Sequence, residues 1–141
     1  MIKDITTICN AEFKIALKSE NDGINKNLTI YIDKNLLVQA ILNIVRNSMQ
    51  ATVENQALRI SLKVLKTRNK LEMKFVDNGK GIDDEDLKNV FVPFFSTKNA
   101  GTGVGLTIAR QLIIAQGGSI NIKSFVGKGT TVSIGFDLLI Q

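Results

Sequence analysis

The chain has 141 residues, enough for one domain that buries a core of its own. Its 44% hydrophobic and 22% charged residues are typical of a soluble globular protein, and no apolar run reaches the roughly 18 residues that a membrane span needs. A single cysteine, Cys9, excludes an internal disulfide, and the first residues lack the form of a signal peptide, so we expect a cytoplasmic protein without direct membrane insertion.

The net charge of +5 comes from 18 basic and 13 acidic residues. The basic residues are scattered and not interleaved with aromatic ones, which argues against nucleic acid as a partner. Attraction to a polyanionic small molecule explains the charge equally well. The chain contains no histidine, which removes the usual general base and the commonest zinc ligand. Any chemistry is therefore expected to work by positioning and electrostatics.

Hydrophobic periodicity and turn residues divide the chain into helices and strands. They predict a helix at about 4–19, a strand at 28–32, a helix at about 35–52, and two strands at 58–66 and 71–76 joined by a hairpin. A short helix at 83–91, a loop at 92–102, a helix at about 103–116 and strands at 119–125 and 130–139 follow. This order predicts a single α+β domain over residues 1–141, a two-layer sandwich of a mixed, mostly antiparallel sheet with helices on one face.

The helix predicted at 35–52 has an unusual polar face. Its carboxamides share this face with a single charge, Arg46; they are Gln39, Asn43, Asn47 and Gln50. A solvated surface is the simple interpretation. However, Asn43 and Asn47 are four residues apart and present their side chains to the same point. A carboxamide oxygen suits one position around Mg²⁺, with phosphates and water completing the shell.

Two glycine-containing segments are candidates for ligand contact. In "VDNGKGID" (76–83), Asp77 ends a strand and could accept a hydrogen bond from an exocyclic amino group such as that of adenine, while Gly79 and Gly81 leave room for a flat ligand. An ordinary strand-to-helix turn is the alternative. In "NAGTGVGL" (99–106), glycines open a helix and could form an anion cradle, or simply a flexible turn before a buried helix.

The segment "FVPFFSTK" precedes the second glycine segment. Phe91, Phe94 and Phe95 are predicted to clamp a mobile loop, and Lys98 is placed to reach a phosphate. "GKGT" (127–130) taken alone is an ordinary hairpin turn.

Together and in this order, "QAILNIVRNSMQA", "DNGKGID", "VFVPFFSTK", "GTGVGL" and "GKGT" resemble the N box, the first glycine box, the F box and the second and third glycine boxes of sensor histidine kinases. The resemblance covers about residues 28–138, and the motif sequences are most similar to those of the nitrogen-regulation type. It implies the catalytic and ATP-binding domain of a two-component kinase, with the Bergerat fold shared by the gyrase, Hsp90 and MutL ATPases.

The resemblance also implies a role for each matching residue, with ATP and Mg²⁺ as cofactors. Asn47 would hold Mg²⁺, with Asn43 in the polar network around the phosphates and Lys98 as the third catalytic residue. Asp77 would bind the adenine amino group beside Gly79, Gly81 and Ile82, with Thr130 near the same end. An ATP lid at about 92–105 would supply the phosphate cradle, formed with Lys98 by Gly101, Thr102, Gly103, Val104, Gly105 and Leu106.

The chain departs from the family pattern at its start. The roughly 27 residues before the first predicted strand are too few for the family's dimerisation hairpin, and no phosphoacceptor histidine is present. We therefore expect an excised or standalone domain, monomeric in isolation. It would phosphorylate a histidine on a separate dimerisation domain, in the parent protein or in trans, with a response regulator downstream, and could not phosphorylate itself on histidine.

Three alternatives remain open at this point. A clamp-type ATPase of the gyrase or MutL kind would need a glutamate as general base four residues before the metal-binding asparagine, where this chain has Asn43. The related serine kinases that act on anti-sigma-factor antagonists usually have the same glutamate. A module that binds nucleotide to regulate a partner, without phosphotransfer, is the third alternative.

Overall fold

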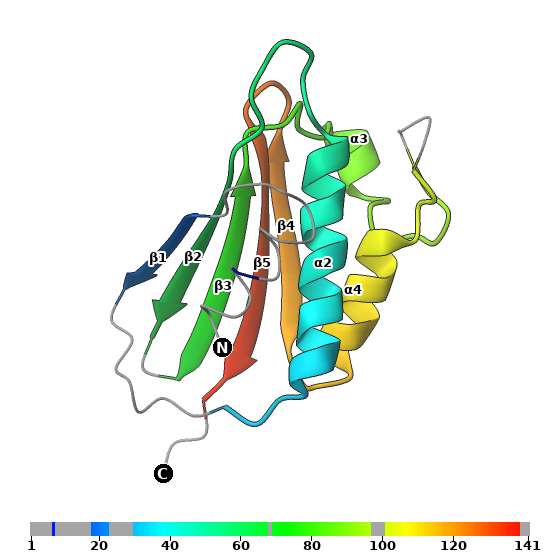
Figure 1. Ribbon diagram of the computed structural model, residues 1–141. Helices are drawn as coiled ribbons and strands as arrows, with labels where there is room; N and C mark the ends of the chain where they lie inside the picture. The colour runs from blue at the N-terminus through cyan, green and yellow to red at the C-terminus, as the bar shows by residue number, and fades with distance from the viewer. Residues whose placement is uncertain (1–6, 8–17, 23–29, 68, 97–100, 139–141) are drawn as a thin grey trace.

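A computed structural model describes residues 7, 18–22, 30–67, 69–96 and 101–138 of the chain. In this part of the chain the strands form a five-stranded sheet in the order β1-β2-β3-β5-β4 (Figure 1). The strands are β1 (Lys18–Asp22), β2 (Ile60–Lys66), β3 (Lys70–Asp77), β4 (Ser119–Phe125) and β5 (Gly129–Asp137). β1 runs parallel to β2, and every other neighbouring pair is antiparallel. The predicted mixed, mostly antiparallel sheet is confirmed.

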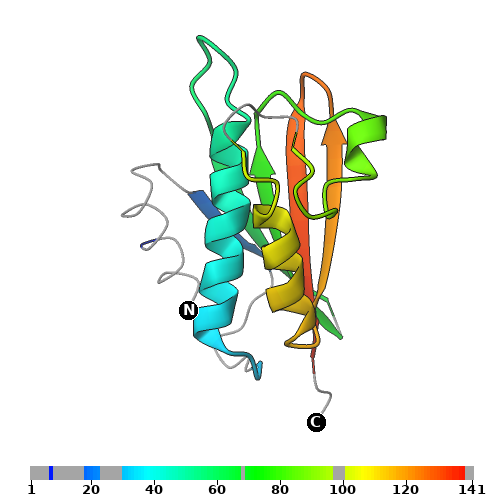
Figure 2. The same ribbon diagram turned by 90° about the vertical axis from the view of Figure 1, so that its right-hand side faces the viewer.

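The helices are α2 (Lys34–Gln50), α3 (Asp84–Leu87) and α4 (Gly105–Ile114). Figures 1 and 2 show α2 and α4 side by side on one face of the sheet, with α3 near the end of the sheet where β3 finishes. This is the two-layer α+β arrangement that the sequence predicts. None of the helices in the described ranges has the length and apolar character needed to cross a membrane.

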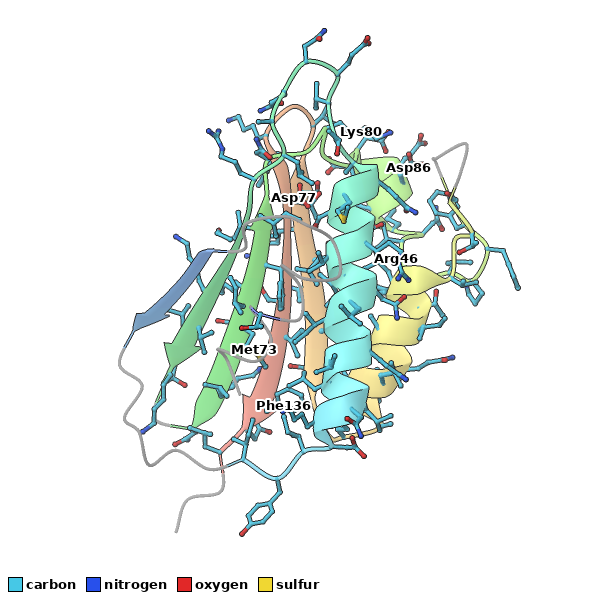
Figure 3. All side chains as sticks on the ribbon, in the orientation of Figure 1. Arg46, Met73, Asp77, Lys80, Asp86 and Phe136 are labelled. Atoms are coloured by element: carbon cyan, nitrogen blue, oxygen red, sulfur yellow. The ribbon has the colours of Figure 1, made fainter. Side chains whose placement is uncertain are left out.

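The core lies between the sheet and these helices. The inward residues of β3 alternate with outward ones, as the two-residue period of a strand requires, and α2 contributes one buried stripe. Met73 and Phe136, labelled in Figure 3, belong to this core. Its largest fully buried side chains are Leu37, Ile41, Ile44, Val45, Leu62, Val64, Met73, Phe75, Ile113, Val132 and Ile134. This packing fixes α2 and α4 relative to the sheet.

The N-terminal predictions need correction. The helix expected at 4–19 is wrong at its end, because residues 18–22 form β1; Thr7 is helical, and the rest of 4–17 lies outside the described residues. The strand expected at 28–32 is wrong at residues 30–32, which are not in a strand, while 28 and 29 are not described. Ile30 and Ile32 pack against the core, which explains their alternation. The β1 segment is polar throughout and carries no hydrophobic alternation, so periodicity does not indicate a strand there.

The other elements differ from prediction only at their ends. α2 begins after Asp33, whose Oδ1 accepts hydrogen bonds from the backbone N–H groups of Asn35 and Leu36. α3 is shorter than the predicted helix at 83–91, ending at Leu87 in a series of turns. α4 starts at Gly105 and not at Gly103, because Gly103 has φ +70°, which no right-handed helix allows.

Candidate functional site

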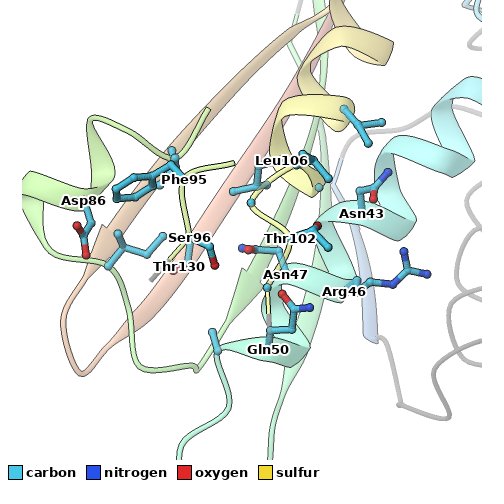
Figure 4. A pocket seen from close by; sticks show the side chains of 18 of the residues that line it. Asn43, Arg46, Asn47, Gln50, Asp86, Phe95, Ser96, Thr102, Leu106 and Thr130 are labelled. Carbon is cyan, nitrogen blue, oxygen red and sulfur yellow. The ribbon is translucent and has the colours of Figure 1, made fainter. Parts of the chain in front are cut away.

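A cavity of about 280 Å³ lies between the C-terminal half of α2, the N-terminus of α4 and the turns at the end of β3 and the start of β5 (Figure 4). Its walls come from segments far apart in the sequence. They are Asn43, Arg46, Asn47, Gln50, Ala51, Lys80, Gly81, Ile82, Asp86, Val90, Phe95, Ser96, Gly101, Thr102, Gly103, Val104, Gly105, Leu106, Ile108 and Thr130.

The polar face of α2 forms one wall of this cavity. Asn43, Arg46, Asn47 and Gln50 all line it, whereas Gln39 does not. The Nδ2 of Asn43 donates a hydrogen bond to the carbonyl oxygen of Gln39, 3.0 Å away and one turn earlier. This bond turns the amide nitrogen of Asn43 back to the helix, so that its Oδ1 lies toward the start of α4, 3.7 Å from the place a Cβ on Gly105 would take.

Asp77 lies behind the cavity wall and is not one of its lining residues. Its side chain is buried, at 4% exposure, and its Oδ1 accepts hydrogen bonds from the backbone N–H groups of Gly79 (2.9 Å) and Thr130 (3.1 Å). Among the described residues no group donates a hydrogen bond to Oδ2. A fully buried oxygen without a partner would resemble Gln116 Oε1, which is the one such side-chain atom in the described residues; Oδ2 is not, and it therefore reaches solvent. Asp77 therefore fixes the turn with one oxygen, and it lines a second, smaller hollow together with Lys74, Lys123 and Thr130.

Gly79 and Gly81 are required by the packing of their own turn, in addition to the ligand contact predicted for them. A Cβ on Gly79 would lie 2.7 Å from the carbonyl oxygen of Ala51, and a Cβ on Gly81, whose φ is +75°, would collide with the carbonyl of Phe125. Two backbone hydrogen bonds hold the turn at these contacts. The Lys80 N–H donates to the carbonyl oxygen of Ala51, and the Gly127 N–H donates to the carbonyl oxygen of Lys80. The two glycines let this turn pack between α2 and the β4–β5 hairpin. Gly81 also lines the cavity, while Gly79 does not.

The second glycine segment and α4 form the facing wall. All the predicted positions from Gly101 to Leu106 line the cavity, whereas Lys98 lies at 97–100, outside the described residues. The stems of the predicted lid meet where Phe94 N–H donates to the carbonyl of Gly103, and Thr107 Oγ1 donates to the carbonyl of Phe91. Val104 caps α4 without a side-chain hydrogen bond, so the first N–H groups of this helix have no side-chain cap.

The predicted clamp of three phenylalanines is wrong for one of them. Phe91 packs against the core, with the guanidinium of Arg110 5.3 Å from its ring centre. Phe95 lines the cavity. Phe94 is 81% exposed and has φ +65°, so it clamps no described part of the chain.

Sequence reasoning missed several lining residues. Lys80 stands between the two glycines of a recognised motif, so its position could have been included. Val90 and Ser96 belong to the predicted F box, which indicated no ligand contact for them. Asp86 and Ile108 lie outside the five motifs, and only the fold brings them to the cavity. Arg46 and Lys80 place positive charge on its walls, as a phosphate site requires.

Comparisons with known proteins point in one direction. The sequence profile described as "Histidine kinase-, DNA gyrase B-, and HSP90-like ATPase" matches residues 32–140. The chain is 40% identical over 107 residues to sporulation kinase D of Bacillus subtilis (strain 168), an overlap that covers 76% of this chain and 21% of that protein. It is 33% identical over 139 residues to sensor histidine kinase ZraS of Escherichia coli (strain K12), covering 93% of this chain and 30% of that protein.

Among solved structures, the catalytic domain of histidine kinase ThkA in a nucleotide-free form superposes with a TM-score of 0.78 at 27% identity, covering 97% of this chain and 90% of that one. The mycobacterial sensor histidine kinase MprB, at 20% identity and a TM-score of 0.77, has the same fold. The chain spans about a fifth to a third of the length of the curated relatives named above.

Proposed function

The chain belongs to the histidine kinase-, DNA gyrase B- and HSP90-like ATPase family, and on that premise we propose that it binds Mg·ATP between α2 and α4 and donates the γ-phosphoryl group to a histidine of a separate domain. One observation carries this proposal. The cavity brings together the asparagine face of α2, the turn after β3, the glycine segment before α4 and Thr130 at the start of β5. Four motifs, spread over nearly ninety residues, thus surround one space.

The residues present fit a nucleoside triphosphate. At one end, Asp77 Oδ2 and the neighbouring Thr130 offer acceptors to the amino group of adenine, and Ile82 and Val90 add apolar walls for the base. Elsewhere in the cavity, Arg46 and the first residues of α4, with their N–H groups, are among the lining residues, which suits phosphate oxygens. Lys98 would add a further cation there.

The residues also fit magnesium held together with phosphates. The described residues contain no group of three or more His, Cys, Asp and Glu that could hold a metal ion by themselves. One carboxamide oxygen plus phosphates and water is a normal Mg²⁺ shell, and Asn47 of α2 would supply that oxygen with Asn43 beside it. When bound, the ion would neutralise charge on the phosphates during transfer.

Phosphoryl transfer requires mainly positioning and charge stabilisation, so the chain needs no catalytic base of its own. The α4 amides, Arg46 and Lys98 would hold the phosphates, and the acceptor imidazole would itself be the nucleophile. Since the sequence has no histidine, the acceptor comes from a separate histidine-bearing dimerisation domain. The related sensor kinases suggest a parent two-component kinase with a response regulator downstream, working in the cytoplasm where its ATP is found.

The hydrolytic alternative is disfavoured by the position where relatives of the gyrase kind keep their base. Asn43 cannot accept a proton, and its amide nitrogen is engaged by its own helix. The carboxylate that lines the cavity among the described residues, Asp86, lies on the other side of it from Asn43 and Asn47 (Figure 4). The α2 wall thus offers no group that would activate water.

A transfer experiment tests this proposal. The chain is mixed with γ-labelled ATP, Mg²⁺ and a purified dimerisation domain of a related sensor kinase that carries its histidine. The proposal predicts acid-labile label on that domain, lost when the histidine is changed to glutamine and when Asn47→Ala replaces the wild-type chain. Rapid phosphate release without label on the partner would contradict it and favour the ATPase. Nucleotide binding without release or transfer, repeated with several partner domains, would favour a regulatory module.

A further inference from the structure

Two buried hydroxyl groups connect three segments behind the cavity. Ser124 of β4 is 6% exposed and Thr130 of β5 is 4% exposed, and their oxygens lie 2.7 Å apart. The Oγ of Ser124 also accepts a hydrogen bond from the backbone N–H of Ile82 at 2.8 Å, and donates to the carbonyl oxygen of Gly129 at 3.0 Å. Ser124 does not line the cavity, but Ile82 and Thr130 do.

The number of protons decides which way the Ser124–Thr130 bond runs. A serine hydroxyl has one proton to donate and two lone pairs that accept. If Ser124 donated to Thr130, its oxygen and the carbonyl oxygen of Gly129 would face each other at 3.0 Å with no proton between them. When the Ser124 proton points to the Gly129 carbonyl oxygen, the Ser124 oxygen accepts from both the Ile82 N–H and the Thr130 hydroxyl, and its donor and both lone pairs have partners. The Thr130 hydroxyl is therefore the donor to Ser124.

This direction determines what Thr130 offers to a ligand. Its proton is used by Ser124, so a ligand that contacts the hydroxyl meets lone pairs. The neighbouring Asp77 is bonded to the backbone N–H of Thr130 through Oδ1, and as a carboxylate it also only accepts. A ligand group that meets both of these acceptors must donate to each of them, which takes two N–H bonds. The 6-amino group of adenine has them, whereas hypoxanthine and guanine have a carbonyl oxygen at that position.

We propose that Ser124 is a positioning residue for base selection: it holds the Thr130 hydroxyl as an acceptor, so that the site prefers 6-amino over 6-oxo purine nucleotides. This inference rests on the proposed nucleotide site. The same serine fixes the backbone of Ile82 at the cavity wall, so it orients two of the groups that the base contacts.

The test compares the Kd of Mg·ATP with that of Mg·ITP by calorimetry, for the wild-type chain and for Ser124→Ala. ITP differs from ATP at the 6-position and at the proton on N1. Without Ser124 the Thr130 hydroxyl turns its proton toward the ligand, and the preference for ATP over ITP falls by about tenfold, the equivalent of one hydrogen bond. Ser119→Ala is the matched control, since Ser119 is on the same strand and its hydroxyl bonds Gly135 at the opposite end.

The outcomes separate this inference from the proposed function. A wild-type chain that binds neither nucleotide contradicts the proposed function. A chain that prefers ATP, with Ser124→Ala weakening ATP and ITP by the same factor, contradicts only the role of Ser124. If Ser124→Ala does not fold, Thr130→Val serves instead, because it keeps the side-chain shape and the backbone bond to Asp77 while removing the acceptor. It too is expected to lower the preference for ATP, and an unchanged preference would overturn the inference.

Discussion

Replacing Asp77 with asparagine changes one carboxylate oxygen into an amide NH2 group and keeps the shape of the side chain. The remaining oxygen can still accept from the backbone N–H groups of Gly79 and Thr130, as Oδ1 does now at 2.9 and 3.1 Å. The new amino group takes the place of Oδ2, the oxygen assigned to adenine. A donor then faces the donor N–H of the base, so Asp77→Asn is expected to weaken ATP binding without unfolding the turn.

The magnitude follows from the bond that is lost. A hydrogen bond to a charged group contributes about 1.5–3 kcal/mol, so the Kd for ATP should rise about ten- to a hundredfold. The two backbone bonds lose their charge assistance, which we expect to cost about 1 kcal/mol of stability and to lower the melting temperature by about 4 °C. Titration calorimetry with Mg·ATP gives the Kd, and calorimetric melting shows that the variant is folded.

Asp83→Asn is the matched control. Asp83 is in the same loop and caps α3, with Oδ1 accepting from the backbone N–H of Asp86 at 2.8 Å, and it does not line the cavity. Asparagine caps helices about as well as aspartate, so this variant should bind ATP as the wild type does. Undiminished ATP affinity in a folded Asp77→Asn variant would refute the assignment of Asp77 to the base.

Three further predictions follow from the same structure. Asn47→Ala should abolish the dependence of ATP binding on Mg²⁺, measured by titrations with and without the ion, whereas Asn35→Ala at the far end of α2, outside the cavity, should keep it. Gly103 has φ +70°, and a Cβ there would lie 2.5 Å from a backbone carbon of Phe94, so Gly103→Ala should weaken ATP binding and lower the free energy of urea unfolding by about 1–3 kcal/mol. Gly117 has φ +75° but open space around it, so Gly117→Ala should lower that free energy by about 1 kcal/mol and leave ATP binding unchanged. Equal losses in the two variants would count against a packed lid stem. Ile44→Ala in the core should cost about 2–5 kcal/mol in the same unfolding assay, and a loss below 1 kcal/mol would contradict the packing of α2 on the sheet.

The sequence predicts the central part of the fold well because its signals there are local. α2 has a cap at Asp33 and a buried stripe, and β3 alternates strictly, so type and position follow from periodicity. β1 could not be predicted in this way, since its five residues are all polar and show no alternation, while its backbone pairs with β2. That pairing is a long-range event with no pattern in the segment itself.

For the site, motifs identify positions but not always their physical role. The packing of the turn after β3 on Ala51 and Phe125, which requires glycine at 79 and 81, could not be read from the motif, and their predicted role of leaving room for a base stays a prediction. Ser124 carries no signal, because a single serine within a strand resembles any other until the hairpin brings it to Thr130. The nitrogen-regulation subtype remains a prediction.

The most direct test of the nucleotide site maps bound ATP on the chain itself. Backbone and side-chain amide NMR spectra of the ¹⁵N-labelled protein are compared before and after addition of Mg²⁺ and a non-hydrolysable ATP analogue. We expect the shifts to concentrate on Gly81, Gly105, Thr130 and the side-chain amide of Asn47, which surround one cavity. Shifts gathered instead on the other face of the sheet, around Lys74 and Lys123, would contradict this location.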